Sequence, residues 1–136
     1  MGILIDTGVF IRWERDGGRI DLGRWSAFGL PAISVISQSE SMVGVHRVDT
    51  PERRDKRLRF VQAIISSVSV LPVDSPIAET HARIVASLSQ MGLSIGPHDS
   101  WIAATAVACN CDLLTTNAIE FRRVPQLRVI DYLEAS

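Results

Sequence analysis

The chain has 136 residues, of which 46% are hydrophobic and 21% are charged, and its formal net charge at pH 7 is −1. This composition excludes an intrinsically disordered chain and a strongly basic nucleic-acid-binding protein, so any contact with nucleic acid would depend on local clusters of positive charge. The length is typical of one domain, and we expect a single domain over residues 1–136.

The cysteine content and the first residues indicate a cytoplasmic protein. Cys109 and Cys111 are too few for a disulfide scaffold or a four-cysteine zinc site, and we expect both thiols to be reduced. The first ten residues carry an acid and no basic segment, unlike a secretory signal. The uncharged stretch at 60–73 is too short and too polar to span a bilayer. We therefore expect no contact with a membrane.

Short apolar strands alternate with longer helical patterns along the chain. In chain order, we expect a strand at 3–5, helices at 35–48 and 49–67, a strand at 68–73, helices at 74–92 and 99–109, and strands at 112–116 and 127–131. Two of these helices begin with a cap followed by proline, namely Thr50 with Pro51 and Ser75 with Pro76. Gly92 is expected to end the second of them.

Strands that alternate with helices favour parallel pairing through right-handed crossovers. The strands are apolar without clean alternation, as in a sheet that is covered on both faces. We therefore expect an α/β fold, a three-layer α/β/α sandwich with a central, mainly parallel sheet. In such folds, functional sites form at the carboxyl ends of the strands.

Four polar residues are candidates for a site at that edge. Asp6 directly follows the first strand and Asn117 follows the strand at 112–116, so their proximity is expected if these strands are parallel. Asp99 opens a helix, and Glu40 lies within another. Taken alone, Asp99 is more often an ordinary acid at a helix N-terminus, and Glu40 is more often a solvated helix residue. The pattern alone leaves the position of both acids open.

Other familiar chemistries find no support in the sequence. A phosphoaspartate site of the DxD type needs an acid at position 8, where this chain has Gly8. Gly-rich phosphate loops and the GxSxG nucleophile motif are absent. The three histidines, His46, His81 and His98, show no metal-binding spacing, and the role of His98 is left unassigned.

Taken together, four motifs resemble the PIN-domain ribonucleases, in particular the VapC toxins of bacterial toxin–antitoxin pairs. They are ILIDTGVFI with Asp6, SVISQSESMVGV with Glu40, GPHDSWIAATAVA with Asp99, and LLTTNAIEFRRVPQLRVID with Asn117. The resemblance covers nearly the whole chain. It implies an endoribonuclease toxin that hydrolyses RNA phosphodiester bonds, forms a homodimer and is neutralised by a small antitoxin.

The resemblance also implies a divalent metal site. Asp6, Glu40 and Asp99 are the expected ligands, and their oxygen atoms suit Mg²⁺ or Mn²⁺ rather than zinc. Many relatives have an aspartate where this chain has Asn117, so Asn117 is a candidate catalytic residue without a charge. Glu120, three residues later, is a possible auxiliary acid that would complete the site.

An acidic site needs positive charge nearby to receive RNA. Thr115 at the pocket edge and Arg53, Arg54 and Arg57 in a basic helix are weaker candidates for substrate binding. The alternative for the basic helix is a solvated face with local ion pairs. Two other functions stay open: a PIN-like domain of weak or no activity that binds RNA or protein, and a metal-dependent DNA or flap nuclease.

Overall fold

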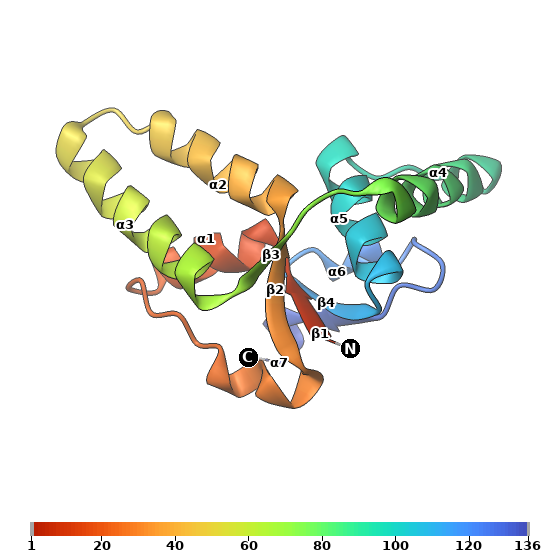
Figure 1. The fold of residues 1–136 in the computed structure, drawn as a ribbon, viewed down its shortest axis with the longest axis horizontal. Helices are drawn as coiled ribbons and strands as arrows, with labels where there is room; N and C mark the ends of the chain where they lie inside the picture. The colour runs from red at the N-terminus through yellow and green to blue at the C-terminus, as the bar shows by residue number, and fades with distance from the viewer. Residues whose placement is uncertain (1, 136) are drawn as a thin grey trace.

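The computed structural model describes residues 2–135, and a parallel sheet of five strands lies at the centre of this part of the chain (Figure 1). Its strands are β1 (Gly2–Ile5), β2 (Leu30–Ser34), β3 (Ser69–Leu71), β4 (Cys111–Thr115) and β5 (Val129–Asp131). They are ordered β3-β2-β1-β4-β5, and each neighbouring pair is parallel. The carboxyl ends of β1 and β4 therefore meet at the same edge.

Helices cover both faces of the sheet, which confirms the expected α/β/α sandwich. The helical elements are α1 (Thr7–Arg15), the 3-10 helix η1 (Gly23–Phe28), α2 (Val35–His46), α3 (Pro51–Ser67), α4 (Ser75–Gln90), α5 (Pro97–Ala108), α6 (Ala118–Phe121) and α7 (Tyr132–Ala135). In Figure 1, α1, α2 and α3 lie on one side of the sheet, and α4, α5 and α6 lie on the other. Within residues 2–135, no helix has the length and apolar character needed to cross a bilayer.

The two faces of β1 belong to two separate hydrophobic clusters. Leu4 packs in the cluster formed with α4 and α5, whereas Ile3 and Ile5 pack in the cluster formed with α1 and α3. Each of these three side chains is at most 1% exposed. Burying a side chain of this size contributes about 1.5–3 kcal/mol, so both faces of the strand favour apolar residues. This double burial explains the apolar run without alternation.

The structure extends and corrects the elements expected from the pattern. The sequence pattern did not indicate strand β2, in which Pro31 follows the exposed Leu30. Helix α5 begins at Pro97, so Asp99 lies inside its first turn and does not open it. Gly92, with a φ of +70°, follows the end of α4 as expected, because glycine adopts this left-handed conformation without strain.

The cap of α4 is Asp74 and not the expected Ser75. The Asp74 Oδ1 atom accepts a hydrogen bond from the Ile77 N–H at 3.1 Å, and Ser75 is the first residue of the helix. The other expected cap is confirmed, because Thr50 Oγ1 accepts from the Arg53 N–H at 3.3 Å. Serine and aspartate both cap helices well, so the sequence alone did not separate two adjacent candidates.

Replacing Asp74 with alanine should therefore lower the free energy of unfolding by about 1 kcal/mol. Urea denaturation of Asp74→Ala and of Ser75→Ala measures the difference directly. Ser75→Ala is the matched control and should unfold within about 0.5 kcal/mol of the parent, as surface substitutions usually do. A larger loss in Ser75→Ala than in Asp74→Ala would contradict the observed cap.

Candidate active site

The ends of β1 and β4 bring the first candidate residues together, as parallel pairing predicts. Asp6 follows β1, and the Thr115 hydroxyl at the end of β4 donates to Asp6 Oδ2 at 2.8 Å. The Asp6 N–H donates to the Leu114 carbonyl at 2.9 Å, which continues the strand pairing to the edge. Gly8 lies beside the Thr116 hydroxyl, where a Cβ atom would collide with it. The start of α1 can therefore pack closely on the end of β4.

Asp6 is a buried carboxylate with both oxygens engaged. Its side chain is 6% exposed, and Oδ1 accepts from the Thr7 N–H at 2.8 Å at the start of α1. Burial raises the pKa of Asp6, whereas the hydrogen bonds from Thr115 and Thr7 oppose this shift. The negative charges of Glu40 and Glu120 raise the pKa of Asp6 further. The carboxylate is thus fixed in orientation within a negative environment.

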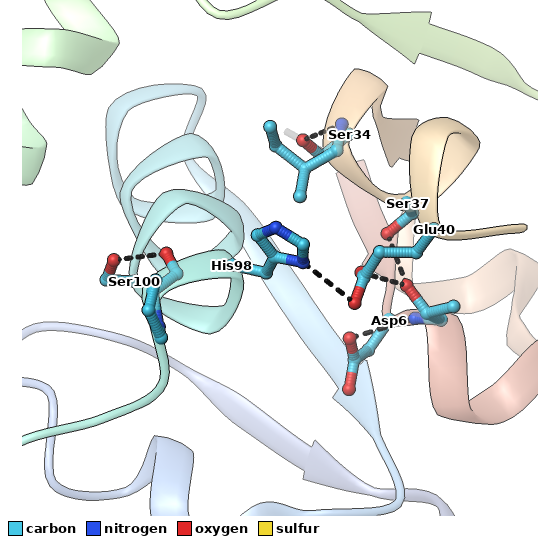
Figure 2. A network of polar contacts seen from close by, with 9 residues as sticks. Asp6, Ser34, Ser37, Glu40, His98 and Ser100 are labelled. Atoms are coloured by element: carbon cyan, nitrogen blue, oxygen red, sulfur yellow. Dashed lines mark hydrogen bonds and ion pairs between the residues drawn. The ribbon is translucent and has the colours of Figure 1, made fainter. Parts of the chain in front are cut away.

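Glu40 connects three helices at the mouth of the site. Its Oε1 atom accepts from the Thr7 hydroxyl at 2.8 Å, and its Oε2 atom lies 3.3 Å from His98 Nδ1. The Thr7 hydroxyl is also hydrogen-bonded to Ser37 Oγ at 2.9 Å. Figure 2 shows His98 of α5 reaching toward Glu40 of α2, with Asp6 beside them. The structure therefore brings Glu40 to the edge where Asp6 lies.

Asp99 completes this group of acids. Burial raises the pKa of Asp99 to about 6, and the charges of Asp6, Glu120 and Glu40 add to the shift, which His98 partly opposes. Among residues 2–135, no hydrogen bond holds the Asp99 carboxylate, and it does not cap α5. Glu40, His98 and Asp99 line one open cleft of about 330 Å³. A carboxylate with a raised pKa in a cleft is a frequent mark of a functional site.

Asn117 and Glu120 lie at the same edge but bind each other. Asn117 Nδ2 donates to Glu120 Oε2 at 2.7 Å, and the Gly96 N–H donates to Glu120 Oε1 at 2.9 Å. The backbone N–H of Asn117 donates to Thr115 Oγ1 at 2.9 Å. Thr115 is fully buried, so its hydroxyl holds Asp6 and the loop after β4 from inside the fold.

The three arginines proposed for substrate binding lie on α3, and each has a partner within the protein. Arg57 forms a two-pronged ion pair with Glu14, at 2.9 and 3.2 Å. Arg53 pairs with Asp49 at 3.4 Å, and Arg54 donates to the Val48 carbonyl at 3.1 Å. The ion pairs of Arg53 and Arg57 fit the alternative interpretation of the basic helix, a solvated face with local ion pairs.

A groove leads from the acids toward this basic surface. A depression of about 210 Å³ is lined by Thr7, Glu40 and Arg57, and it adjoins a larger cleft of about 680 Å³ that shares Arg57 and Phe60 with it. The larger cleft is lined by four basic side chains, Arg47, Arg53, Lys56 and Arg57, and by two acids, Glu14 and Asp49, which pair with Arg57 and Arg53. The acidic site and the basic cleft are therefore neighbouring parts of one surface.

Sequence reasoning did not single out Thr7 and Ser37, and it named Thr115 only as a weak candidate for substrate binding, whereas its fully buried hydroxyl holds Asp6. The Thr7 hydroxyl of α1 contacts both the Ser37 hydroxyl and the Glu40 carboxylate of α2. His98, to which no role was assigned, pairs with Glu40. Ser37 precedes Glu40 by three residues, a spacing that places both on one helix face, but serines and threonines are too common for this signal to stand out.

The buried Thr115 hydroxyl gives a direct test of how Asp6 is held. Thr115→Val removes the donor to Asp6 and the acceptor of the Asn117 N–H, so it should lower the free energy of unfolding by about 1–3 kcal/mol. Thr105→Val is the matched control, because Thr105 is equally buried but its hydroxyl donates only to the Trp101 carbonyl of its own helix. Thermal and urea unfolding should rank Thr115→Val as the less stable variant, and the opposite order would contradict this account.

The donor atoms of the site fit a hard divalent cation. Asp6, Glu40 and Asp99 offer carboxylate oxygens, which Mg²⁺ and Mn²⁺ prefer. Burial raises the pKa of Asp99 most, and the neighbouring charges of Asp6, Glu120 and Glu40 raise it further. In the side-chain arrangement described for residues 2–135, no three His, Cys, Asp or Glu side chains form a ready-made metal cluster. Binding would thus require carboxylates to turn toward a shared ion.

Comparison with known proteins identifies the family. The family model described as "PIN domain" matches residues 3–127. The chain is 38% identical to Ribonuclease VapC1 of Rickettsia felis and 35% identical to Ribonuclease VapC of Rickettsia bellii, in each case over 96% of both chains. It also resembles a chain in the crystal structure of DNA-bound VapBC from Salmonella typhimurium, with 28% identity, a TM-score of 0.83, and coverage of 96% of this chain and 98% of that one. This chain therefore belongs to the PIN domain family.

Proposed function

We propose that this chain is an endoribonuclease toxin that uses Mg²⁺ or Mn²⁺ to hydrolyse RNA phosphodiester bonds. The observation that carries the proposal is the meeting of Asp6, Glu40 and Asp99 at the carboxyl edge of the sheet, where they share a negative environment. Carboxylates held together in this way favour a bound cation. The ribonuclease names of the relatives support the same activity.

The three acids and the two threonines beside them have different roles in the proposed site. Asp6, Glu40 and Asp99 would hold the ion, which when bound supplies Lewis-acid chemistry to a phosphodiester and to water. Thr115 and Thr7 fix the directions of the Asp6 and Glu40 carboxylates. One of the three acids would accept the proton that the attacking water loses.

The basic cleft is the proposed path for the RNA backbone. Arg53 lines this cleft, and its exposed ion pair with Asp49 at 3.4 Å can give way to a phosphate at little cost. Arg54 lies on the same helix and makes one hydrogen bond, to the Val48 carbonyl. Arg57 is held by Glu14, and its guanidinium lies where the cleft meets the groove that contains Glu40. Phosphate contacts of this kind are sensitive to salt, so RNA binding should weaken as salt rises.

Two further properties belong to the proposal. A small antitoxin protein would neutralise the activity; this is supported by the similarity to a chain in the structure of VapBC-5 from Mycobacterium tuberculosis, a member of the VapBC family of toxin–antitoxin systems. The chain would act as a homodimer in the cytoplasm. Light scattering tests the dimer, and co-expression with a candidate antitoxin tests the neutralisation.

The experiment that tests the function is a cleavage assay on a pool of RNA. Purified protein with millimolar Mg²⁺ or Mn²⁺ should cut RNA, EDTA should stop the reaction, and added metal should restore it. A DNA pool of the same sequences is the matched control and should remain intact. Cleavage of DNA but not RNA would favour the DNA or flap nuclease, and the absence of any cutting or metal binding would favour an inactive binding domain.

A further inference from the structure

A continuous chain of hydrogen bonds links Asp6 to the first residues of α5. Thr115 Oγ1 donates to Asp6 Oδ2 at 2.8 Å and accepts from the Asn117 N–H at 2.9 Å. The Asn117 side-chain amide then donates to Glu120 Oε2 at 2.7 Å, and Gly96 N–H donates to Glu120 Oε1 at 2.9 Å. The path crosses from β1 to β4, α6 and α5.

The chemistry of the Glu120 carboxylate explains why position 117 carries an amide. An ionised carboxylate only accepts hydrogen bonds, so both protein contacts of Glu120 must come from donors. Gly96 supplies one donor and Asn117 supplies the other. An aspartate at position 117 would bring a second acceptor and a like charge to the same place. The amide thus serves as a donor to Glu120, which an aspartate at this position could not be.

The hydrogen bond from the Gly96 N–H to Glu120 connects the Glu120 carboxylate to the helix that carries Asp99. Gly96 is the N-cap of α5, and Asp99 lies three residues further on in the first turn. No side chain of α5 caps this end, so Glu120 of α6 satisfies the free Gly96 N–H from outside the helix. In a capping box, the acid that bonds the N-cap N–H comes from the helix itself. Here the same bond ties two separate elements together.

We propose that Asn117 and Glu120 are positioning residues that clamp the start of α5, and thereby hold Asp99 beside Asp6. The clamp is defined as Asn117, Glu120 and Gly96. Its consequence for RNA cleavage rests on the proposed function, whereas its hydrogen bonds can be tested without any substrate or metal. In this account, neither Asn117 nor Glu120 needs to contact the ion.

The first test follows the Gly96 amide by NMR in the metal-free protein. Glu120→Ala removes the acceptor and should reduce the hydrogen-exchange protection of the Gly96 amide by about tenfold or more. Glu120→Gln should keep the protection of the Gly96 amide within about threefold of the parent. The oxygen of the new glutamine can accept from the Gly96 N–H, and its NH₂ group can donate to the Asn117 side chain once the Asn117 amide turns over.

A swap of partners provides the matched control. Asn117→Asp should weaken the clamp, because two carboxylates then face each other. The double variant Asn117→Asp with Glu120→Gln restores one donor and one acceptor with the same total charge as the parent. It should recover Gly96 protection to within about threefold of the parent value.

RNA cleavage should follow the same order as Gly96 protection. Glu120→Ala and Asn117→Asp should slow cleavage by about tenfold or more, and the double variant should recover to within about threefold of the parent. Unchanged Gly96 protection in Glu120→Ala would overturn the clamp. Equal loss of cleavage in Glu120→Gln and Glu120→Ala, with protection kept in the former, would assign Glu120 a ligand role instead. If the parent does not cut RNA, the proposed function fails, and the NMR series still decides on the clamp.

Discussion

Asp99→Asn should slow RNA cleavage by about a thousandfold or more while leaving the fold intact. The Asp99 carboxylate makes no hydrogen bond within residues 2–135, so an amide of the same shape breaks none. The substitution does remove one of the charges that the proposed metal site needs. Single-turnover cleavage of RNA with Mg²⁺ or Mn²⁺ measures the loss, and circular dichroism reports on the fold.

Asp21→Asn is the matched control for this experiment. Asp21 is an exposed acid in the loop before η1, and the same exchange of carboxylate for amide should leave the cleavage rate within about twofold of the parent. Asp6→Asn should be as inactive as Asp99→Asn, since Asp6 shares the site. Cleavage by Asp99→Asn at a rate within about tenfold of the parent would remove Asp99 from the set of ligands.

In the metal-free protein, the contribution of Asp99 to stability should fall as the pH rises through about 6. Burial and neighbouring acids raise the pKa of Asp99 from 3.8 to about 6, so the folded state holds this proton more tightly than the unfolded state. The resulting stabilisation is complete below the unfolded pKa and is lost as the pH passes the folded pKa. The stabilisation lost should amount to about 1–2 kcal/mol. This is less than the full shift in the pKa of Asp99 would give, because the side chain is partly exposed.

The same effect predicts that Asp99→Asn, although it slows cleavage, makes the metal-free protein more stable. In EDTA at neutral pH, urea denaturation should give the variant a free energy of unfolding about 1–2 kcal/mol higher than that of the parent. Near pH 4, the free energies of unfolding of the two proteins should converge. Added Mn²⁺ should stabilise the parent and have little effect on the variant, because a ligand stabilises only the state that binds it. A variant less stable than the parent at neutral pH would mean that the Asp99 charge is already compensated in the folded protein.

The sequence predicted the sheet and part of the site because both depend on short-range patterns. Asp6 and the residues after β4 were expected to meet, since parallel strands end at one edge, and the Thr115–Asp6 hydrogen bond confirms it. The four long helices from α2 to α5 lie close to their expected ranges. Strand β2 was missed because Pro31, which has no N–H for strand pairing, argues against a strand at this position.

The remaining features of the site depend on how distant elements pack. Whether Asp99 reaches Asp6 depends on where α5 begins relative to the sheet edge, which its own periodicity does not encode. The Gly96–Glu120 hydrogen bond and the His98–Glu40 contact place that beginning at the carboxyl edge. The partners of the acids, such as Thr7, are likewise common residues that acquire a role only through tertiary contacts.

The most direct test of a divalent site formed by Asp6, Glu40 and Asp99 is a crystal of the parent soaked in millimolar Mn²⁺ and measured for anomalous scattering. We expect a Mn²⁺ peak about 2 Å from carboxylate oxygens of these residues, at the carboxyl edge between β1 and α5. The same soak of Asp99→Asn should show a much weaker peak. The absence of Mn²⁺ at these carboxylates in the parent, or its binding only elsewhere, would contradict the proposed site.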